Sequence, residues 1–417
     1  MKQFIFKSYD FDKVNSLAKF EYGFNDGRTF IETVTFEVGE RYDDQLLDKA
    51  LFLAFMLIGT SYYKTFPLAT VRLGYKLDNL QVDFFNTVYQ EGLGQFAFEN
   101  NLTRDDLAHF TATGPMPTGG VKYNGSGILA LQSGGKDSLL TAELLKKSGK
   151  EFTSWYISSS DNYPKVLDKI GAKLALSRRN IDHDGLRKAE ADGGLKGHVP
   201  VTYIVQSLAI IQAILLNKNE VITSIAHEGE EPHAFIGDLA VNHQWSKTWM
   251  AEMMFAKYVS IYISPDLHIG SLIRGLSELR VAELFVKNVW PDYGHDFSSC
   301  NLANYKQGND NSVLKWCGNC PKCANSYLLF APFLEAVDLK SLFDGQDLFV
   351  KPDLVNTFKG LLEIDGVMKP FECVGEVDEL RLAYHMAQKK GGYAQLPFDV
   401  PESTFDYLKT YQSQVSL

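Results

Sequence analysis

The chain has 417 residues, of which 45% are hydrophobic, and a formal net charge of −10 at pH 7. This length predicts two or three domains with ample hydrophobic cores. The acidic balance argues against a nucleic-acid-binding surface built on bulk positive charge, although a small anionic substrate needs only a few local cations.

The first residues lack the apolar stretch of a signal peptide. The longest apolar run, residues 50–58, is far shorter than the roughly 20 residues that span a membrane, and it favours a buried helix. We therefore expect a cytoplasmic protein that binds neither membrane nor nucleic acid. The sequence carries no signal for an oligomeric state.

Residues 1–122 are predicted to form an α+β N-terminal domain. Alternating polar and apolar residues around Asn-Asp-Gly indicate a hairpin over 20–38, and apolar spacing predicts helices over 43–59 and 83–98. The group Thr60-Ser-Tyr-Tyr-Lys64 follows the first helix, so Tyr63 and Lys64 are candidates for binding the substrate, or for simply ending the helix. Proline and glycine in 111–126 mark the expected domain boundary.

The most informative stretch is Gly127–Leu140, where a short apolar strand, a glycine turn and a helix follow one another. Glycines let a ligand approach the backbone, and the unpaired N–H groups and the dipole of a helix N-terminus favour an anion. Asp137 could also hold Mg²⁺. The spacing does not fit the G-x-x-x-x-G-K-[ST] loop, because Ala130 and Asp137 occupy two of its positions. The predicted phosphate-binding residues are Ser133, Gly134, Gly135, Lys136, Asp137 and Ser138.

From residue 123 to about 290, strands and helices alternate, which predicts a parallel sheet with helices on both faces. Ligands bind such sheets beyond the carboxyl ends of the strands. The predicted strands are 128–131, 152–157, 172–176, 220–226 and 259–263, and the predicted helices are 139–145, 201–216, 268–286 and one that begins within 242–247 and runs to 257.

Two polar loops could supply the chemistry at this edge of the sheet. His227–His233 combines three carboxylates with two imidazoles, and Asn242–Lys247 is similarly polar; either could be a solvated loop or a functional cluster. The candidate acid–base residues are Glu228, His243 and Lys247, and Gln244 and Arg274 are candidates for the substrate.

Residues 291–417 are predicted to form a helical C-terminal region with a cysteine cluster. Cys300, Cys317, Cys320 and Cys323 supply four thiolates from one segment. Four sulfur ligands complete a tetrahedral sphere, so the pattern predicts a structural Zn²⁺ site, with an iron–sulfur cluster or reduced thiols as the alternatives. Cys373 lies outside this set and is expected to be a buried hydrophobic residue.

The Ser133–Ser138 loop resembles the pyrophosphate (PP) loop of the ATP pyrophosphatase superfamily, which implies an adenine nucleotide alpha hydrolase-like core. The loop, Val199-Pro200 and Cys300–Cys323 resemble the 7-cyano-7-deazaguanine synthase group. A closer resemblance, over most of the chain, is to the UDP-N-acetylmuramoyl-L-alanyl-L-glutamate epimerase (MurL) family. It extends through Ser61–Lys64, Ser133–Ser138, His198–Thr202, Asn242–Lys247 and Cys317–Cys323, and it departs from the family at His227–Glu231, where an Asn-Glu-Arg-Ser type sequence is expected.

The second resemblance implies an isomerase of peptidoglycan synthesis that uses ATP and Mg²⁺ to invert the terminal L-glutamate of a nucleotide-linked muramoyl dipeptide to D-glutamate. It also implies that His198 contributes to ATP binding. The sequence leaves two other classes of protein open. One is a ligase or synthetase that adenylates its substrate with ATP and lets an amine displace the AMP, and the other is a nucleotide-sensing scaffold. A requirement for a nitrogen source would identify the ligase, and absence of turnover the scaffold.

Overall fold

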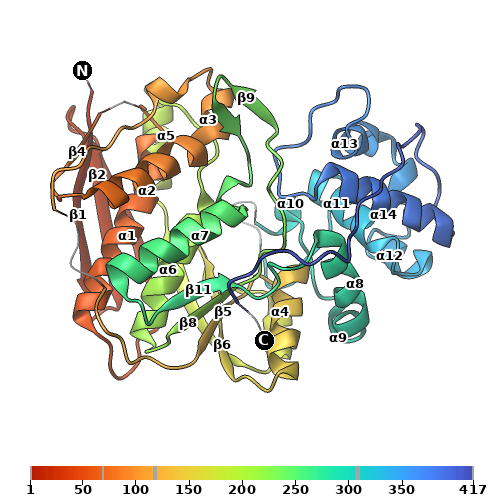
Figure 1. The fold of residues 1–417 in the computed structure, drawn as a ribbon, viewed down its shortest axis with the longest axis horizontal. Helices are drawn as coiled ribbons and strands as arrows, with labels where there is room; N and C mark the ends of the chain where they lie inside the picture. The colour runs from red at the N-terminus through yellow and green to blue at the C-terminus, as the bar shows by residue number, and fades with distance from the viewer. Residues whose placement is uncertain (1, 68–69, 116–119, 306–309, 416–417) are drawn as a thin grey trace.

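One nine-stranded, mostly parallel sheet runs through the molecule (Figure 1). The computed structural model describes residues 2–67, 70–115, 120–305 and 310–415. The strand order is β11-β8-β5-β6-β7-β3-β2-β1-β4. The strands of this sheet are β1 (Phe4–Asp12), β2 (Leu17–Phe24), β3 (Thr29–Thr35), β4 (Val71–Leu73), β5 (Ile128–Leu131), β6 (Phe152–Ser158), β7 (Lys173–Asn180), β8 (Glu220–Thr223) and β11 (His268–Ser271).

The sheet has a mainly antiparallel N-terminal part, in which β4 pairs in parallel with β1, and a parallel central part. β2 and β3 form the predicted hairpin, and β1 adds a strand that the sequence did not predict. β3 then pairs antiparallel with β7, so the N-terminal strands extend the central sheet across the boundary expected at residue 122. Within the predicted boundary segment 111–126, residues 116–119 lie outside the described part of the chain.

Helix α1 (Asp44–Tyr63) is the central helix of the N-terminal half. The Asp43 side chain caps it by accepting hydrogen bonds from the N–H groups of Gln45 and Leu46. The helix continues beyond the predicted end at Gly59, because Tyr62 and Tyr63 pack inside an aromatic core. It is long and apolar enough to cross a membrane, but 83% of its apolar window is buried inside the fold, as in the core helix of a globular protein.

Alternate residues of β5 divide the protein into two hydrophobic cores. Leu129 faces a core shared with α1 and the helices beside it, whereas Ile128 and Ala130 face a core shared with α4, α8 and the C-terminal helices. Helices thus cover both faces of the parallel part, as predicted. The helices are α2 (Asn79–Gln90), α3 (Gly94–Glu99), α4 (Lys136–Lys147), α5 (His183–Ala191), α6 (Val201–Leu215), α7 (Trp249–Tyr258), α8 (Glu278–Asn288), α9 (Trp290–Tyr293), α10 (Asn301–Asn304), α11 (Pro321–Phe330), α12 (Ala336–Ser341), α13 (Val355–Leu361) and α14 (Val377–Lys390).

Three predicted elements were wrong. The strand expected at 259–263 is a π-helical turn that continues α7, because its β-branched residues pack on the N-terminal core as part of a helix. The helix expected from His268 begins at Glu278, since His268–Ser271 pair in parallel with β8 as strand β11. The helix expected over 83–98 is α2 and α3, separated by a tight turn.

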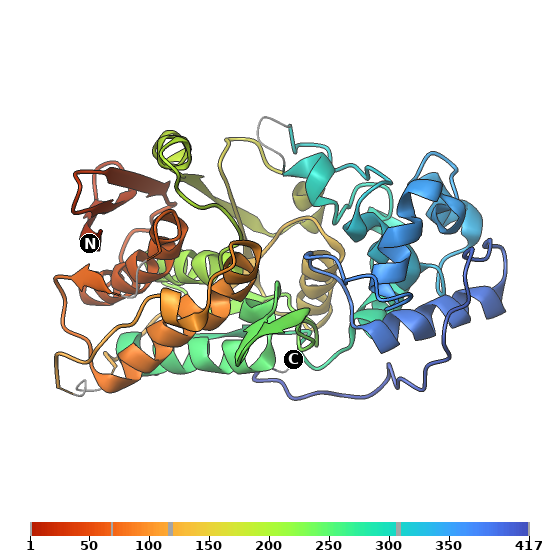
Figure 2. The same ribbon diagram turned by 90° about the horizontal axis from the view of Figure 1, so that it is seen from above.

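The C-terminal region packs its helices beside α8, and the chain then returns to the sheet (Figures 1 and 2). After α14 the described residues 391–415 form bends and turns rather than a helix, which departs from the predicted helical tail. The N–H of Tyr411 donates to the Gly275 carbonyl, and its ring stacks on His227 at 3.5 Å between centroids. The tail therefore ties the C-terminal region to the loop between β11 and α8.

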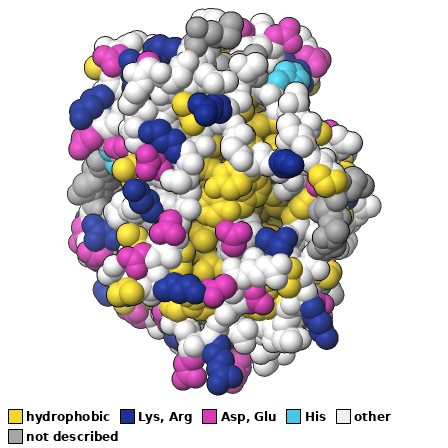
Figure 3. All heavy atoms as spheres, turned by 90° about the vertical axis from the view of Figure 1, so that its left-hand side faces the viewer, with side chains coloured by type: hydrophobic (Ala, Val, Ile, Leu, Met, Phe, Trp, Pro, Cys, Tyr) yellow, Lys and Arg dark blue, Asp and Glu magenta, His cyan; other side chains and the backbone are white. Residues whose placement is uncertain are grey.

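The face formed by the N-terminal strands carries hydrophobic side chains at its centre and charged side chains around them (Figure 3). Tyr75, which is 37% exposed, stacks on Tyr9 with ring centroids 5.6 Å apart. The aromatic core of the N-terminal half thus reaches the surface at this end, far along the sheet from the parallel strands.

Candidate active site

The predicted phosphate-binding loop lies at the carboxyl end of β5, between that strand and α4. Gly134 has a φ of +78°, and a Cβ there would come within 2.7 Å of Leu314, so this position requires glycine. The Ser138 hydroxyl accepts from the N–H of Ser133 at 3.2 Å and donates to the Gly135 carbonyl. Tyr305 donates to the Ser133 carbonyl at 3.0 Å. The loop is therefore held in shape by its own serines and by the C-terminal region.

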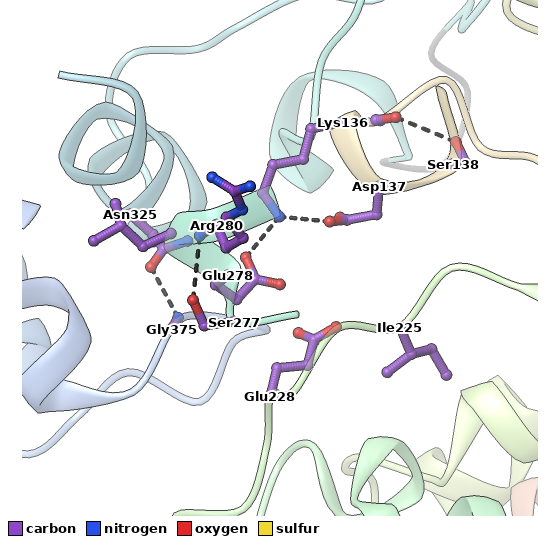
Figure 4. A network of polar contacts seen from close by, with 12 residues as sticks. Lys136, Asp137, Ser138, Ile225, Glu228, Ser277, Glu278, Arg280, Asn325 and Gly375 are labelled. Carbon is purple, nitrogen blue, oxygen red and sulfur yellow. Dashed lines mark hydrogen bonds and ion pairs between the residues drawn. The ribbon is translucent and has the colours of Figure 1, made fainter. Parts of the chain in front are cut away.

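Lys136 is buried, and its ammonium group binds two carboxylates. Its Nζ lies 2.6 Å from Asp137 Oδ1 and 2.6 Å from Glu278 Oε2. Figure 4 shows Lys136 reaching from the start of α4 to the start of α8, with the Glu228 carboxylate facing Glu278 from a separate loop. Burial alone would lower the pKa of Lys136, but Asp137 and Glu278 raise it above its ordinary value, so Lys136 is an ammonium at neutral pH.

The partly buried Lys247 and the buried Glu228 form a second ion pair near the first. Lys247 Nζ lies 3.3 Å from Glu228 Oε2. Burial opposes the charge on Lys247, yet Cys373 and Glu228 raise its pKa. Burial, with the neighbouring Glu228 and Asp137 charges, raises the pKa of Glu278 to about 7 although Lys136 opposes this. The carboxylates of Asp137, Glu228 and Glu278 thus share the ammonium groups of two lysines. The Glu278 carboxyl keeps its proton to near neutral pH.

Arg274 binds the backbone next to this cluster. Its guanidinium is fully buried and lies 2.7 Å from Glu252 Oε2. It also donates to the backbone carbonyls of Ala226 and Lys247, at 2.8 and 2.9 Å. Every one of these partners is internal, so Arg274 fixes the Lys247 loop, and the substrate contact expected from the sequence stays a prediction.

His198, His243 and Lys64 form a third polar group. The two imidazole rings lie 4.3 Å apart, His243 Nδ1 is 2.7 Å from Gln95 Oε1, and Lys64 Nζ donates to the Gly197 carbonyl. Burial lowers the pKa of His198 to about 3, of His243 to about 4 and of Lys64 to about 8. Both imidazoles are therefore neutral at physiological pH.

Two other candidates from the sequence have internal partners. Tyr63 is fully buried, with its ring packed edge-on against Tyr89 at 5.3 Å, so it belongs to the aromatic core rather than to a ligand surface. Gln244 Nε2 donates to the Val374 carbonyl at 2.8 Å, which joins the Lys247 loop to the C-terminal region.

A cavity of about 340 Å³ connects the loop to Lys247. Several of its lining residues were not predicted from the sequence: Gln132, Gln206, Thr223, Ser224, Ser298, Ser299, Asn301, Tyr305 and Lys322. Glu278 was missed as well. The helix expected from His268 placed Ser277 inside a helix, whereas Ser277 is the N-cap of α8. Gln132 could have been found, since it directly precedes the loop; the others meet it only in the folded chain.

The four predicted zinc ligands converge in the C-terminal region. The sulfurs of Cys300, Cys317, Cys320 and Cys323 all lie within 4.8 Å of one another. Sγ–Sγ distances of 3.6, 3.7 and 3.5 Å join Cys300 to Cys320, Cys317 to Cys323 and Cys320 to Cys323. Tetrahedral Zn–S bonds of about 2.3 Å would place sulfurs about 3.8 Å apart, so the donor set fits a structural zinc ion. Cys373 is half-buried and outside the set.

The fold and the site together define an α/β protein with a polar cavity beyond the carboxyl ends of parallel strands, next to the buried Lys136 and the partly buried Lys247.

Comparison with known proteins gives the family. The MurL N-terminal domain matches residues 1–272, and the MurL C-terminal domain matches residues 296–401. A relative from Xanthomonas oryzae is 32% identical over 89% of this chain and 82% of its own length, and one from Salinispora tropica is 31% identical over 95% and 87%. Both are named UDP-N-acetyl-alpha-D-muramoyl-L-alanyl-L-glutamate epimerase. The chain belongs to this epimerase family, so it is an enzyme of the isomerase class.

Proposed function

We propose that this enzyme inverts the terminal L-glutamate of UDP-MurNAc-L-Ala-L-Glu to D-glutamate, with ATP as co-substrate and release of AMP and pyrophosphate. The observation that carries the proposal is that the glycine loop and Lys247, which is paired with Glu228, lie at one cavity in a chain that belongs to the epimerase family. The loop offers a site for phosphate, and the pair offers groups that can move a proton.

Adenylation explains why a nucleotide-binding loop would serve an epimerase. A free carboxylate resists loss of its α-proton, because the resulting carbanion would add a second negative charge beside the first. An acyl-adenylate presents a neutral carbonyl in its place, so the enolate forms far more easily. Proton return from the opposite face inverts the carbon, and hydrolysis of the acyl-adenylate then releases AMP.

The residues of the phosphate-binding loop and those around it would each have a role in this reaction. Ser133–Ser138 and the N-terminus of α4 would hold the departing pyrophosphate through backbone N–H and hydroxyl groups. Mg²⁺, held by the Asp137 carboxylate that lines the cavity, would neutralise phosphate charge. His198 stays our candidate for an additional ATP contact. The protonated Lys247 is proposed as the acid, with Glu228 holding it in place, and the neutral His243 as the base.

The test uses purified protein, ATP, Mg²⁺ and UDP-MurNAc-L-Ala-L-Glu in deuterated water. We expect AMP to form and deuterium to enter the glutamate α-carbon, with D-glutamate recovered after hydrolysis. AMP without deuterium would reject the epimerase and retain an adenylating enzyme, and a dependence of AMP formation on added amine would identify a ligase. Absence of both signals would reject the proposal altogether.

A further inference from the structure

The cavity beside the phosphate-binding loop holds buried polar groups that lack partners. Both side-chain polar atoms of Gln132, Oε1 of Gln206 and Oγ1 of Thr223 have no hydrogen-bond partner among the residues that the structure describes. These three side chains are only 6%, 3% and 2% exposed, and all three residues line the cavity. They come from the end of β5, from α6 and from the end of β8. Because buried polar groups in folded proteins are almost always paired, their gathering at one cavity indicates a polar ligand.

Lys322 adds a positive charge to the same cavity. It lies between Cys320 and Cys323, in the first turn of α11, so the proposed zinc site fixes the backbone on both sides of it. It lines the cavity together with Lys247, and within the described chain its side chain makes no ion pair. The other two lysines of the site, Lys136 and Lys247, are already neutralised by carboxylates. Lys322 is thus a cation that a ligand carboxylate can pair with.

The substrate of the proposed reaction has one carboxylate that needs such a partner. Adenylation neutralises the α-carboxyl group of the terminal glutamate, but the γ-carboxylate keeps its charge throughout. A cavity that takes this residue beside Lys247 therefore requires a cation for the γ-carboxylate and neutral hydrogen-bonding groups around the α-carbon. Lys322 meets the first requirement, and the unpaired amides and hydroxyl meet the second.

A second cavity leaves room for the UDP-MurNAc group of the substrate. It has a volume of about 750 Å³, lies beyond the ends of β6 and β7, and shares Val205 and Tyr305 with the first. The smaller cavity holds Lys247 and the unpaired groups, so we place the reacting amino acid there and the larger substrate group beside it.

We propose that Lys322 binds the γ-carboxylate of the terminal glutamyl residue and thereby selects a dicarboxylic amino acid. Gln132, Gln206 and Thr223 bind the polar atoms around its α-carbon. This assignment rests on the proposed function, because the chemistry of the glutamyl ligand comes from it. It makes the cysteine cluster part of substrate recognition, since the two flanking cysteines hold Lys322 at the cavity.

The test compares binding of UDP-MurNAc-L-Ala-L-Glu and UDP-MurNAc-L-Ala-L-Gln by calorimetry without ATP. We expect the wild-type protein to prefer the glutamate ligand. Lys322→Met should weaken that ligand about 10- to 100-fold and leave the glutamine ligand unchanged, because a charge-assisted hydrogen bond is lost. Lys322→Arg should restore part of the preference. Lys315→Met, an exposed lysine of the same cysteine-containing segment, is the matched control.

Metal content and thermal midpoint equal to wild type would establish that Lys322→Met is folded. A Lys322→Met protein that still prefers glutamate, or that loses affinity for ATP instead, overturns the assignment. Thr223→Val and Gln206→Met should weaken the binding of both peptide ligands equally. Unchanged binding in both variants would show that Thr223 and Gln206 bind water rather than the ligand, which would contradict their assignment. Binding needs no turnover, so an absence of deuterium exchange in the wild type would reject epimerisation separately.

Discussion

At the scale of single residues, the site is a cluster of buried charges with an excess of carboxylates. Lys136 and Lys247 balance two of the carboxylates among Asp137, Glu228 and Glu278. An uncompensated buried charge is costly, so the extra carboxyl holds a proton near neutral pH. The protonation of such a cluster is expected to change when a phosphate, a metal ion or a substrate carboxylate enters the site.

Lys247 is expected to be needed for inversion rather than for adenylation. Lys247→Met should reduce the formation of D-glutamate about 100-fold or more, because general acid–base groups contribute that much. AMP formation should persist, since the phosphate-binding loop is intact, and His243→Ala should have the same pattern. Glu228→Gln/Lys247→Met is the companion variant that leaves no unpaired buried carboxylate. Unchanged formation of D-glutamate in Lys247→Met and His243→Ala would contradict the assignment.

Glu379 makes stability depend on pH. Burial raises its pKa from 4.5 to about 8, and its Oε2 is buried without a partner in the described chain. The folded state therefore holds this proton more tightly than the unfolded state. The stability that the proton contributes is fully present below pH 4.5 and is lost as pH rises towards 8.

Glu379→Gln removes that titration while keeping an acceptor for the Leu279 N–H. We expect the variant to raise the free energy of unfolding at pH 8.5 by roughly 1 to 3 kcal/mol and to change it little at about pH 5, as measured with urea. Asp378→Asn, an exposed neighbour on α14, should leave the pH dependence unaltered. A variant as pH-dependent as the wild type would show that Glu379 does not titrate in this range.

At the scale of elements, α1 and the π-helical turn show how packing overrides local signals. Gly59 predicts a helix end, but the helix passes through it because Phe6 and Tyr89 pack where a side chain would be. Val259–Ile263 has the β-branched composition of a strand, but the turn continues α7 onto the N-terminal core. In both cases burial of aromatic and aliphatic surface outweighs a preference of about 1 kcal/mol.

Gly59→Ala is expected to destabilise the protein, although alanine favours helix. The added Cβ would lie 2.6 Å from Phe6 Cε1 and 2.7 Å from the Tyr89 hydroxyl, and both rings are buried. Overpacking of this kind costs about 1 to 3 kcal/mol in the free energy of unfolding, more than the helix preference returns. Gly74→Ala, with no atom within 4 Å of its new Cβ, is the control. Equal stability of the two variants would mean that the core relaxes around the methyl group added on α1.

At the scale of the whole molecule, the C-terminal region completes a site that begins in the sheet. It supplies Ser298, Ser299, Asn301, Tyr305 and Lys322 to the cavity at the end of β5. Its extended tail returns to the loop before α8, and Tyr411 stacks on His227 beside Glu228. The cysteine cluster organises the segment that carries most of these residues, so metal binding and substrate binding are expected to be linked.

Metal removal tests that link. The wild-type protein should contain about one zinc ion per chain by elemental analysis, and Cys317→Ser should lose it. Loss of zinc should lower the thermal midpoint and weaken peptide binding, because Cys320 and Cys323 then no longer fix Lys322. Cys373→Ser should retain the metal, since that thiol lies outside the cluster. Full zinc content in Cys317→Ser would contradict the four-cysteine site.

The sequence by itself determined the features that depend on neighbouring residues. The strand, loop and helix around Ser133–Ser138, the β2–β3 hairpin and the C-x-x-C spacing are local patterns with local physical causes, and the α/β class follows from their order. The resemblance to the epimerase family also came from such segments, and the family comparison confirms it.

Only the tertiary structure decided which distant side chains share the cavity. Gln206, Thr223 and Lys322 come from α6, β8 and α11, and Gln132 directly follows β5. Glu278 reaches Lys136 across 142 positions of the chain. It likewise decided that His268–Ser271 is a strand, because that segment gains its hydrogen bonds from β8 rather than from its own neighbours. Contacts between residues far apart in sequence arise from packing the whole chain, which no local pattern encodes.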